Sequence, residues 1–383
     1  MRSLALVRRL CLPAFLLLLG CKGDDSGTTL YVYDNTSSTV RAWSDVATVY
    51  DAASAGTTVP DPDRVITSSL YSGITLAWGG VTMDTSRDRL YLVSQGGMVF
   101  DIHNAGSASG TISATADITY FSLGVSTERY SSGSVFGAAS IDSNGNILYV
   151  LETALDGSGC RVWKVDTAST QTNATTITPA TTYTVGIDTD TYGSGVAAIP
   201  GSGVFGLYGG GGAIYTASST FTGPRIRLGP SGTFVSTNSA GYGYDVVIGG
   251  DTLLGSGITY GAIGYDATNT CLYVLDGPSP TGIHVFNKSQ FTSGSLDEAP
   301  VRTMGDSASS LADLRIIAHA PYSDWLLGAE YSATTSGTGT GTGLPTLFIW
   351  KKPSDGGTAV QASLPASTSG TLQIRGMTIG TGD

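Results

Sequence analysis

Charged residues are scarce in this sequence. Asp, Glu, Lys and Arg make up 13% of its 383 residues, about half of the ~25% that is usual. Basic residues are the rarer kind, with 19 Lys and Arg against 30 Asp and Glu, for a net charge of −11. Because nucleic acids are bound through a basic face, this balance excludes them as partners.

Histidine is rare as well. His103, His284 and His319 are the only three, and none of them has a second ligand at the spacing of a structural zinc site. The sequence shows no other metal-ligand or cofactor-binding pattern, so we predict neither a metal nor a cofactor.

Long hydrophobic runs are also missing. The apolar stretch 10–19 is interrupted by Pro13 and is shorter than the ~20 residues that a membrane-spanning helix needs. It follows three basic residues, Arg2, Arg8 and Arg9, as in a secretory signal peptide. The pattern predicts export rather than a permanent transmembrane helix.

The segment 18–21, Leu-Leu-Gly-Cys, ends this stretch and closely resembles the lipobox of bacterial lipoproteins. The resemblance implies cleavage after residue 20 and acyl chains on Cys21, which tether the mature chain to a membrane. Two or more chains, at about 0.8 kcal/mol per buried CH₂, suffice for stable anchoring. Lys22 follows where an Asp favours inner-membrane retention in this family, so we expect delivery to the outer membrane of the cell envelope. Removing residues 1–20 takes away three basic residues and no acidic one, which leaves a net charge of −14.

One unit recurs along the mature chain: an apolar strand opened by Gly and closed by Asp, a strand of the Leu-Tyr-Val type, and a strand that ends in an aromatic residue. Three strong copies begin with Gly79–Asp84, Gly137–Asp142 and Gly261–Asp266. The second strands of the strong and weaker copies start at Leu30, Leu90, Leu148, Phe205, Leu272 and Leu326, 54 to 67 residues apart. A repeat of this length with three or four strands is typical of a β-propeller blade.

The two ends of the chain complement each other. Leu30–Tyr33 and Val40–Trp43 are a second and a third strand without a first, and Gly376–Gly380 is a first strand without followers. Joining them in one blade closes the ring and removes exposed sheet edges. We therefore predict an all-β, six-bladed β-propeller, a single domain over 28–383 after a signal peptide (1–20) and a lipidated linker (21–27). Strand-like material in 223–260 leaves seven blades as an alternative, and strong helical periodicity is absent throughout.

The repeats resemble the NHL-like or YVTN-like repeats of exported bacterial propellers, which share the glycine-led inner strand, the Asp turn and the Leu-Tyr-Val strand. Pro200 and Ala320 stand in place of the Asp in two copies. The resemblance implies binding or scaffolding as the usual role, with enzymes as a minority, and it specifies a fold rather than a reaction.

Asp84, Asp142 and Asp266 close the inner strands just before a turn, where an Asx side chain bonds to the local backbone. Their recurrence favours this role over a metal or acid-base role. The segment 142–146 is similar to the start of a calcium loop, but Thr153 stands where an EF-hand has Glu. The Gly-Asp-Ser at 305–307 resembles a serine esterase block without its helix context, so we assign no catalytic residue.

The recurring aromatic residues and the remaining cysteines are assigned no functional role. The aromatic residues Trp43, Trp163, Phe286 and Trp350 recur at one blade position and are expected to pack between blades. Cys11 lies in the signal peptide, whereas Cys160 and Cys271 precede a third and a second strand. These two should lie on opposite faces, too far apart for a disulfide.

Alignment of the first strands places Arg315 and Arg375 at equivalent points near one channel mouth, where other copies have Gly. Aromatic residues precede this position in three copies. Guanidinium groups suit carboxylate, sulfate or phosphate groups through bidentate hydrogen bonds. The candidate ligand-binding residues are therefore Arg315, Arg375, Trp78, Tyr260 and Phe136. In the alternative, each arginine pairs with a nearby acid and the aromatic residues only pack between blades.

Three functional hypotheses follow. The first is a binding or scaffold module for an unknown protein, glycan or small anionic ligand. The second is a lactonase-like hydrolase or lyase, which needs Asp, Glu, Asn or His gathered at one channel mouth, and the first strands offer no such cluster. The third is a purely structural envelope protein with a solvated Ser- and Thr-rich surface.

Overall fold

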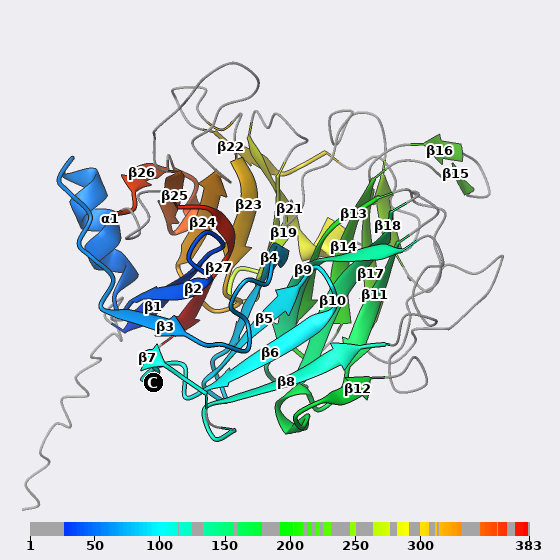
Figure 1. The fold of residues 1–383 in the computed structure, drawn as a ribbon. Coiled ribbons are helices and arrows are strands. Elements are labelled where there is room, and N and C mark those ends of the chain that lie inside the picture. The colour runs from blue at the N-terminus through cyan, green and yellow to red at the C-terminus, as the bar shows by residue number, and fades with distance from the viewer. Residues whose placement is uncertain are drawn as a thin grey trace, which may run out of the picture.

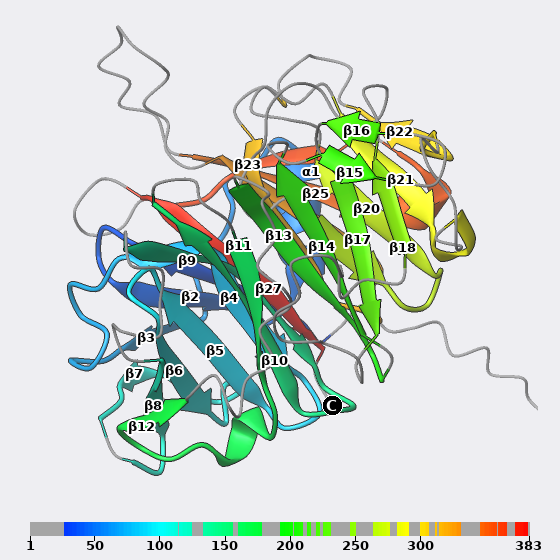
Figure 2. The same ribbon diagram turned by 90° about the vertical axis from the view of Figure 1, so that its right-hand side faces the viewer.

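The computed structural model describes residues 27–113, 115–124, 133–155, 160–177, 192–201, 203–209, 213–215, 220–222, 225–230, 246–249, 263–275, 282–290, 299–305, 311, 314–330, 345–357, 359–365 and 372–381. These residues form antiparallel sheets that stand like blades around a central axis (Figures 1 and 2). This arrangement defines a β-propeller.

The innermost strands of the sheets are β4 (Leu76–Asp84), β9 (Ser134–Asp142), β13 (Tyr192–Ile199), β19 (Ile263–Asp266), β23 (Leu314–His319) and β27 (Ile374–Thr381). The second strands are β1 (Thr28–Asp34), β5 (Arg89–Ser94), β10 (Ile147–Ala154), β14 (Gly203–Gly209), β20 (Cys271–Leu275) and β24 (Trp325–Glu330). Nearly every residue of β5 and β10 is buried, because each blade is packed between two neighbours. The Leu-Tyr-Val pattern is the result.

The third strands are β2 (Thr39–Trp43), β6 (Met98–His103), β11 (Cys160–Val165), β17 (Arg225–Pro230), β21 (Ile283–Asn287) and β25 (Thr346–Lys351). The fourth strands are β3 (Arg64–Thr67), β8 (Ile118–Leu123), β18 (Val246–Gly249), β22 (Arg302–Met304) and β26 (Val360–Ser363). The strand-like material within 223–260 therefore supplies β17 and β18 of the β13 blade.

The expected count of six blades is corrected by the sheet topology. The described residues form five complete blades of four or five strands, and the sheet β11-β10-β9, with only three strands, is an incomplete blade. The strand that follows β11 is β12 (Thr175–Ile177), and it pairs in parallel with β8 of the preceding blade. Likewise β7 (Gly110–Thr111) adds to β3 of the blade before it. These segments cover the outer edges of neighbouring blades.

The ring closes as the sequence predicts. The last strand, β27, pairs antiparallel with the first, β1, from Thr28 opposite Thr381 to Tyr33 opposite Gly376. One blade is thus built from both ends of the described chain. On its other side, β27 packs against β4 of the next blade, where Gly376 faces Val81 with no room for a Cβ atom.

The aromatic residues at the ends of the third strands lie in the core between blades, as predicted. Trp43, Trp163, Phe286 and Trp350 are at most 2% exposed. Trp43 belongs to a hydrophobic cluster that includes Ile316 of a neighbouring blade, so these side chains join adjacent sheets. Cys271 is buried and free. Cys160 pairs with Thr153 at the end of β10, whereas Cys271 pairs with Asp266 at the end of β19. The two cysteines therefore lie at opposite ends of their blades, as expected.

The described residues contain one α-helix that the sequence analysis does not predict. Helix α1 (Val46–Ser54) lies between β2 and β3 and packs against β26. Asp45 caps it by accepting a hydrogen bond from the backbone N–H of Ala47 at 2.9 Å. Single 3₁₀ turns occur at Ala168–Thr170, Lys288–Gln290 and Pro353–Asp355. No helix among the described residues is long and apolar enough to cross a membrane.

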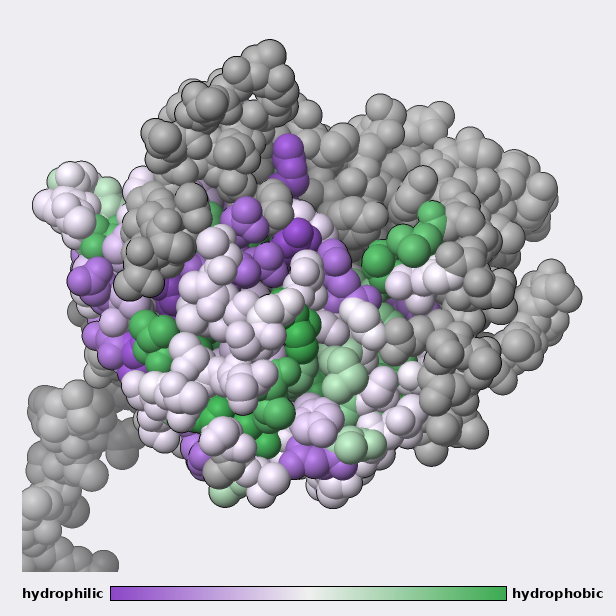
Figure 3. Space-filling model, viewed as in Figure 1, coloured by the Kyte–Doolittle hydropathy of each residue, from purple (hydrophilic) through white to green (hydrophobic). Residues whose placement is uncertain are grey.

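Two small hairpin strands, β15 (Ala213–Tyr215) and β16 (Thr220–Thr222), pair with each other. In the view of Figure 3, the described surface is mostly of weak polarity, and hydrophobic residues lie in small separate areas. This face therefore offers no broad apolar patch of described residues for a partner.

The propeller has two faces, set by the direction of the innermost strands. The turn face carries the turns that join innermost to second strands, such as 84–89 and 142–147, together with Thr28 and Thr381. The bulge face carries the starts of the innermost strands. At that end the pairing with the second strand slips in β4, β9, β13, β23 and β27. Bulges of this kind re-aim side chains at the rim of a sheet structure.

Candidate functional site

A channel runs along the axis between the innermost strands. All six contribute to its wall, and the empty volume is about 510 Å³, which includes space open to solvent. The described lining is built from small and apolar residues with a few hydroxyl groups, Thr82, Ser140, Tyr265 and Thr378 among them. The hydroxyl oxygen of Ser140 accepts a hydrogen bond from the backbone N–H of Ala198 at 2.9 Å, so it links two neighbouring blades.

The largest bulge lies in β4 at the entrance of this channel. Leu76 pairs with Ser94 and Val81 pairs with Leu92, so five residue steps along β4 lie opposite two steps along β5. Gly79 adopts a positive φ of 69°, which an L side chain rarely adopts. The bulge contains Trp78, whose side chain packs against the hydrophobic cluster that includes Ile374 and Met377 of β27.

Trp78 meets Arg375 across the ring closure. The Cζ atom of Arg375 lies 4.2 Å from the centroid of the Trp78 ring, in a cation-π stack. Arg375 is the residue at which the pairing of β27 with β1 slips, between Ile374 and Gly376. Two bulges from different blades therefore bring these two predicted site residues together, with Arg375 half-buried.

Arg315 holds the equivalent position in β23. It is the residue left out between Leu314 and Ile316 in the pairing with β24, and it too is half-buried. Its Nη1 donates a hydrogen bond to the carbonyl oxygen of Leu314 at 3.0 Å. The structure thus places Arg315 and Arg375 at matching bulges on the same face.

Phe136, another of the predicted site residues, does not join this group. Phe136 is 1% exposed and packs against Trp163, with ring centroids 6.1 Å apart, so it serves the core rather than a ligand surface. Tyr260 and Cys21 lie outside the described residues. Of the predicted ligand set, the described structure joins Trp78 to Arg375 and sets Arg315 in a matching bulge.

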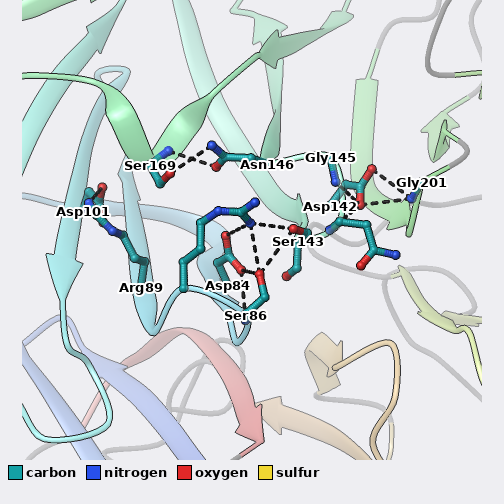
Figure 4. A network of polar contacts seen from close by, with 12 residues as sticks. Asp84, Ser86, Arg89, Asp101, Asp142, Ser143, Gly145, Asn146, Ser169 and Gly201 are labelled. Atoms are coloured by element: carbon teal, nitrogen blue, oxygen red, sulfur yellow. Dashed lines mark hydrogen bonds and ion pairs between the residues drawn. The ribbon is translucent and has the colours of Figure 1, made fainter.

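The repeated aspartates occupy the turn face, and their role there is structural. Oδ1 of Asp142 accepts from the backbone N–H groups of Asn144 and Gly145 within its own turn, at 3.0 and 3.1 Å. Both of its carboxylate oxygens also accept from the N–H of Gly201 in the next blade, at 3.1 and 3.0 Å (Figure 4). With its oxygens bonded to N–H donors, Asp142 acts as a turn and blade-to-blade link rather than as a calcium ligand.

Asp84 makes a similar link through an arginine. Its carboxylate pairs with Arg87 at 3.0 Å, and Arg87 donates to the carbonyl oxygen of Ser143 in the next blade at 2.5 Å (Figure 4). Asp84, Asp142 and Asp266 are at most 1% exposed. The turn role predicted from the sequence is confirmed, and the contact with the following blade adds to it.

A buried cluster at the β19–β23 seam was not apparent in the sequence. Nε2 of His319 lies 3.8 Å from Oδ2 of Asp266, with side chains 0% and 1% exposed. The hydroxyl of Tyr273 donates to the same Oδ2 at 3.2 Å, and Cys271 lies beside both groups. Gly264 makes room for the imidazole, since a Cβ atom there would lie 3.0 Å from that of His319.

Burial is the main cause of the pKa shifts of His319 and Cys271 in this cluster. It lowers the pKa of His319 to about 4, and the nearby Asp266 carboxylate opposes that shift. Burial also raises the pKa of the Cys271 thiol. Neither ring nitrogen of His319 has a hydrogen-bond partner among the described residues. The imidazole is therefore neutral at pH 7 and acts as a packed core group. Within the described residues no group of three His, Cys, Asp or Glu side chains is placed to hold a metal ion.

The fold is a β-propeller, and Arg315 and Arg375 lie at bulges of its innermost strands. No protein-family model and no curated protein matches this sequence. Among solved structures, the chain is similar to the Cps50 (Swd1) β-propeller domain of Myceliophteria thermophila, at 10% identity over 88% of this chain and 86% of that one, with a TM-score of 0.46.

Two further structures are similar at lower scores. Dihydro-heme d1 dehydrogenase NirN matches at 9% identity over 90% of this chain and 75% of its own, with a TM-score of 0.40. The Dos1 propeller matches at 8% identity over 85% of this chain and 64% of its own, also with a TM-score of 0.40. At such identities the likeness concerns the fold alone.

Proposed function

We propose that this protein is a lipid-anchored binding module of the bacterial cell envelope, tethered to the outer membrane through Cys21, with its ligand site at the bulge face of the propeller. The lipobox-like segment 18–21 supports the anchor. The resemblance of the repeats to NHL-like and YVTN-like propellers supports a binding or scaffold role.

The observation that carries the ligand site is the stack of Arg375 on Trp78 at 4.2 Å. The contact places a planar cation beside an aromatic ring, and a guanidinium group suits carboxylate, sulfate or phosphate oxygens. Because the mature chain has a net charge of −14, the positive potential at Arg375 differs from that of the rest of the surface. A small anionic ligand, such as an acidic sugar or an organic acid, fits this chemistry.

Binding is favoured over hydrolysis by the composition of the channel wall. Its described residues include no carboxylate, and the side chain of His319, which is among them, is 0% exposed. A lactonase-like reaction requires a general base or a metal at the channel. The described wall instead presents hydroxyl groups and backbone, which suit recognition.

Calorimetric titration of the soluble propeller with a panel of acidic sugars and small organic acids tests the site. We expect at least one member to bind, with the affinity reduced tenfold or more in Arg375→Ala and weakened in Trp78→Ala. Lys288→Ala removes the same charge from a loop on the turn face and should leave binding unchanged. If Arg375→Ala and Trp78→Ala bind the whole panel as the parent protein does, the ligand site is refuted.

A further inference from the structure

The position of the anchor relative to the two faces follows from strand order. β1 is a second strand, so it begins at the turn face with Thr28 and ends at the bulge face with Asp34. Thr28 pairs with Thr381, the closing residue of β27. Trp78 and Arg375 lie near the opposite ends of β4 and β27, at their bulges. The chain therefore enters the propeller on the face that does not hold the proposed ligand site.

The segment between the anchor and the propeller is short. From Cys21 to Thr28 there are seven residue steps, which span at most about 25 Å when fully extended. β1 has seven residues, and at roughly 3.4 Å per residue it separates the two faces by about 20 Å.

The segment is too short for the bulge face to lie against the membrane. To bring the bulge face to the membrane, the segment would have to pass outward over β2, β3 and β7, about 14 Å at ~4.8 Å per strand. It would then have to climb the ~20 Å height of the blade. The sum exceeds the reach of about 25 Å, so the segment cannot make this path.

We infer that the turn face lies next to the membrane and that the bulge face, with Arg375 and Trp78, opens away from it toward the surrounding compartment. The inference rests on the proposed lipid anchor at Cys21. It identifies the accessible partner as a soluble ligand or a molecule on an opposing surface, and excludes the headgroups of the anchoring membrane as the ligand.

Fluorescence quenching on the lipidated protein tests this orientation. A bimane label is placed at Asn144→Cys on the turn face or at Thr36→Cys on the bulge face, both exposed positions. Each variant carries Cys160→Ser, and Cys271 is buried and free. The full lipoprotein is reconstituted in phosphatidylcholine vesicles that contain a headgroup-spin-labelled phosphatidylcholine. We expect quenching at position 144 to be at least twice that at position 36.

The outcomes separate the two proposals. If the protein floats with the vesicles but quenching at position 36 equals or exceeds that at position 144, the orientation is wrong and the anchor stands. If the acylated protein does not float, the anchor fails and the orientation falls with it. The Cys21→Ala forms of both labelled variants serve as controls and should show no quenching.

Discussion

Nε2 of His319 lies 3.8 Å from Oδ2 of Asp266, and this pair joins the innermost strands of two neighbouring blades in a fully buried setting. Burial lowers the pKa of His319 to about 4 in the folded protein, against an ordinary value of about 6.5 in the unfolded chain. The folded state therefore resists protonation of this imidazole.

The sign of the resulting pH dependence is fixed by this shift. Below about pH 6.5 the unfolded chain binds a proton that the folded state rejects until about pH 4, so the free energy of unfolding falls through this window by about 3 kcal/mol in total. Urea unfolding between pH 7.5 and 4.5 measures the effect. His319→Gln, which is neutral throughout, should flatten this part of the profile. An equal slope in the variant and the parent protein would contradict the assignment to His319.

Removing the carboxylate of Asp142 should destabilise the propeller. Asp142→Ala leaves the N–H groups of Asn144, Gly145 and Gly201 without their acceptor, and we expect a loss of about 3 kcal/mol in the free energy of unfolding. Asp166 offers a matched control because its side chain is 44% exposed and forms an ion pair with Lys164 at 3.0 Å. Asp166→Ala should cost less than about 1 kcal/mol. Equal losses in chemical denaturation would refute the blade-linking role of Asp142.

Replacing the predicted lipid attachment site should release the protein from membranes. Cys21→Ala removes the only thiol in the lipobox-like segment 18–21, and with it the attachment point for the acyl chains of the proposed anchor. Cell fractionation with immunoblotting should then find the variant in the soluble envelope fraction, and metabolic labelling with a fatty acid should be lost. A variant that still sediments with membranes and is extracted only by detergent would show that another element binds the bilayer.

Deleting the last strand should abolish the fold. Residues 372–381 include β27, which pairs with β1 and packs against β4, so its loss exposes the edge of β1 and opens the ring. We expect an aggregated or protease-sensitive product, measured by size-exclusion chromatography and limited proteolysis. Deletion of only 382–383 is the control and should leave a monodisperse protein. A folded truncation with native resistance to protease would show that the ring does not depend on β27.

The sequence predicts most of the strand framework because a blade packed on both sides imposes a repeating pattern. Leu90, Leu148 and Leu272 lie in second strands that each begin one residue earlier, and the strand Gly376–Gly380 completes the blade of Leu30. These assignments rest on local patterns of hydrophobicity and on turn residues. The same local reasoning identifies Asp142 as a turn residue, although the bond to Gly201 depends on the next blade.

Features that depend on contacts between distant segments are not visible in the sequence. The pairing of β12 with β8 changes the strand count of a blade, yet nothing within Thr175–Ile177 distinguishes an outer strand of its own blade from one of its neighbour. Helix α1 has nine residues and buries only Val46 and Val49, too few for a clear helical period.

The positions of the candidate site residues could be predicted from the repeats, but the contacts between them could not. Alignment of the repeats places Trp78 and Arg375 at adjacent ring positions, but their stack depends on two bulges in different blades. Phe136 shares the aligned position of Trp78 and turns into the core, because its strand has a shorter bulge. His319 and Asp266 belong to neighbouring copies of the repeat, but the repeat pattern does not show which side chains meet between the two blades.

The pairing of Thr28 with Thr381 also sets the timing of maturation. A chain that leaves the ribosome from its N-terminus delivers β1 first and its innermost partner β27 last, more than 340 residues later. Contacts of such high sequence separation form slowly, and unpaired strands are prone to aggregation until they do. The first blade therefore stays incomplete until β27 has been made, so premature termination leaves an open ring that proteases can attack. Only chains that include β27 can close the ring and so become resistant to proteases.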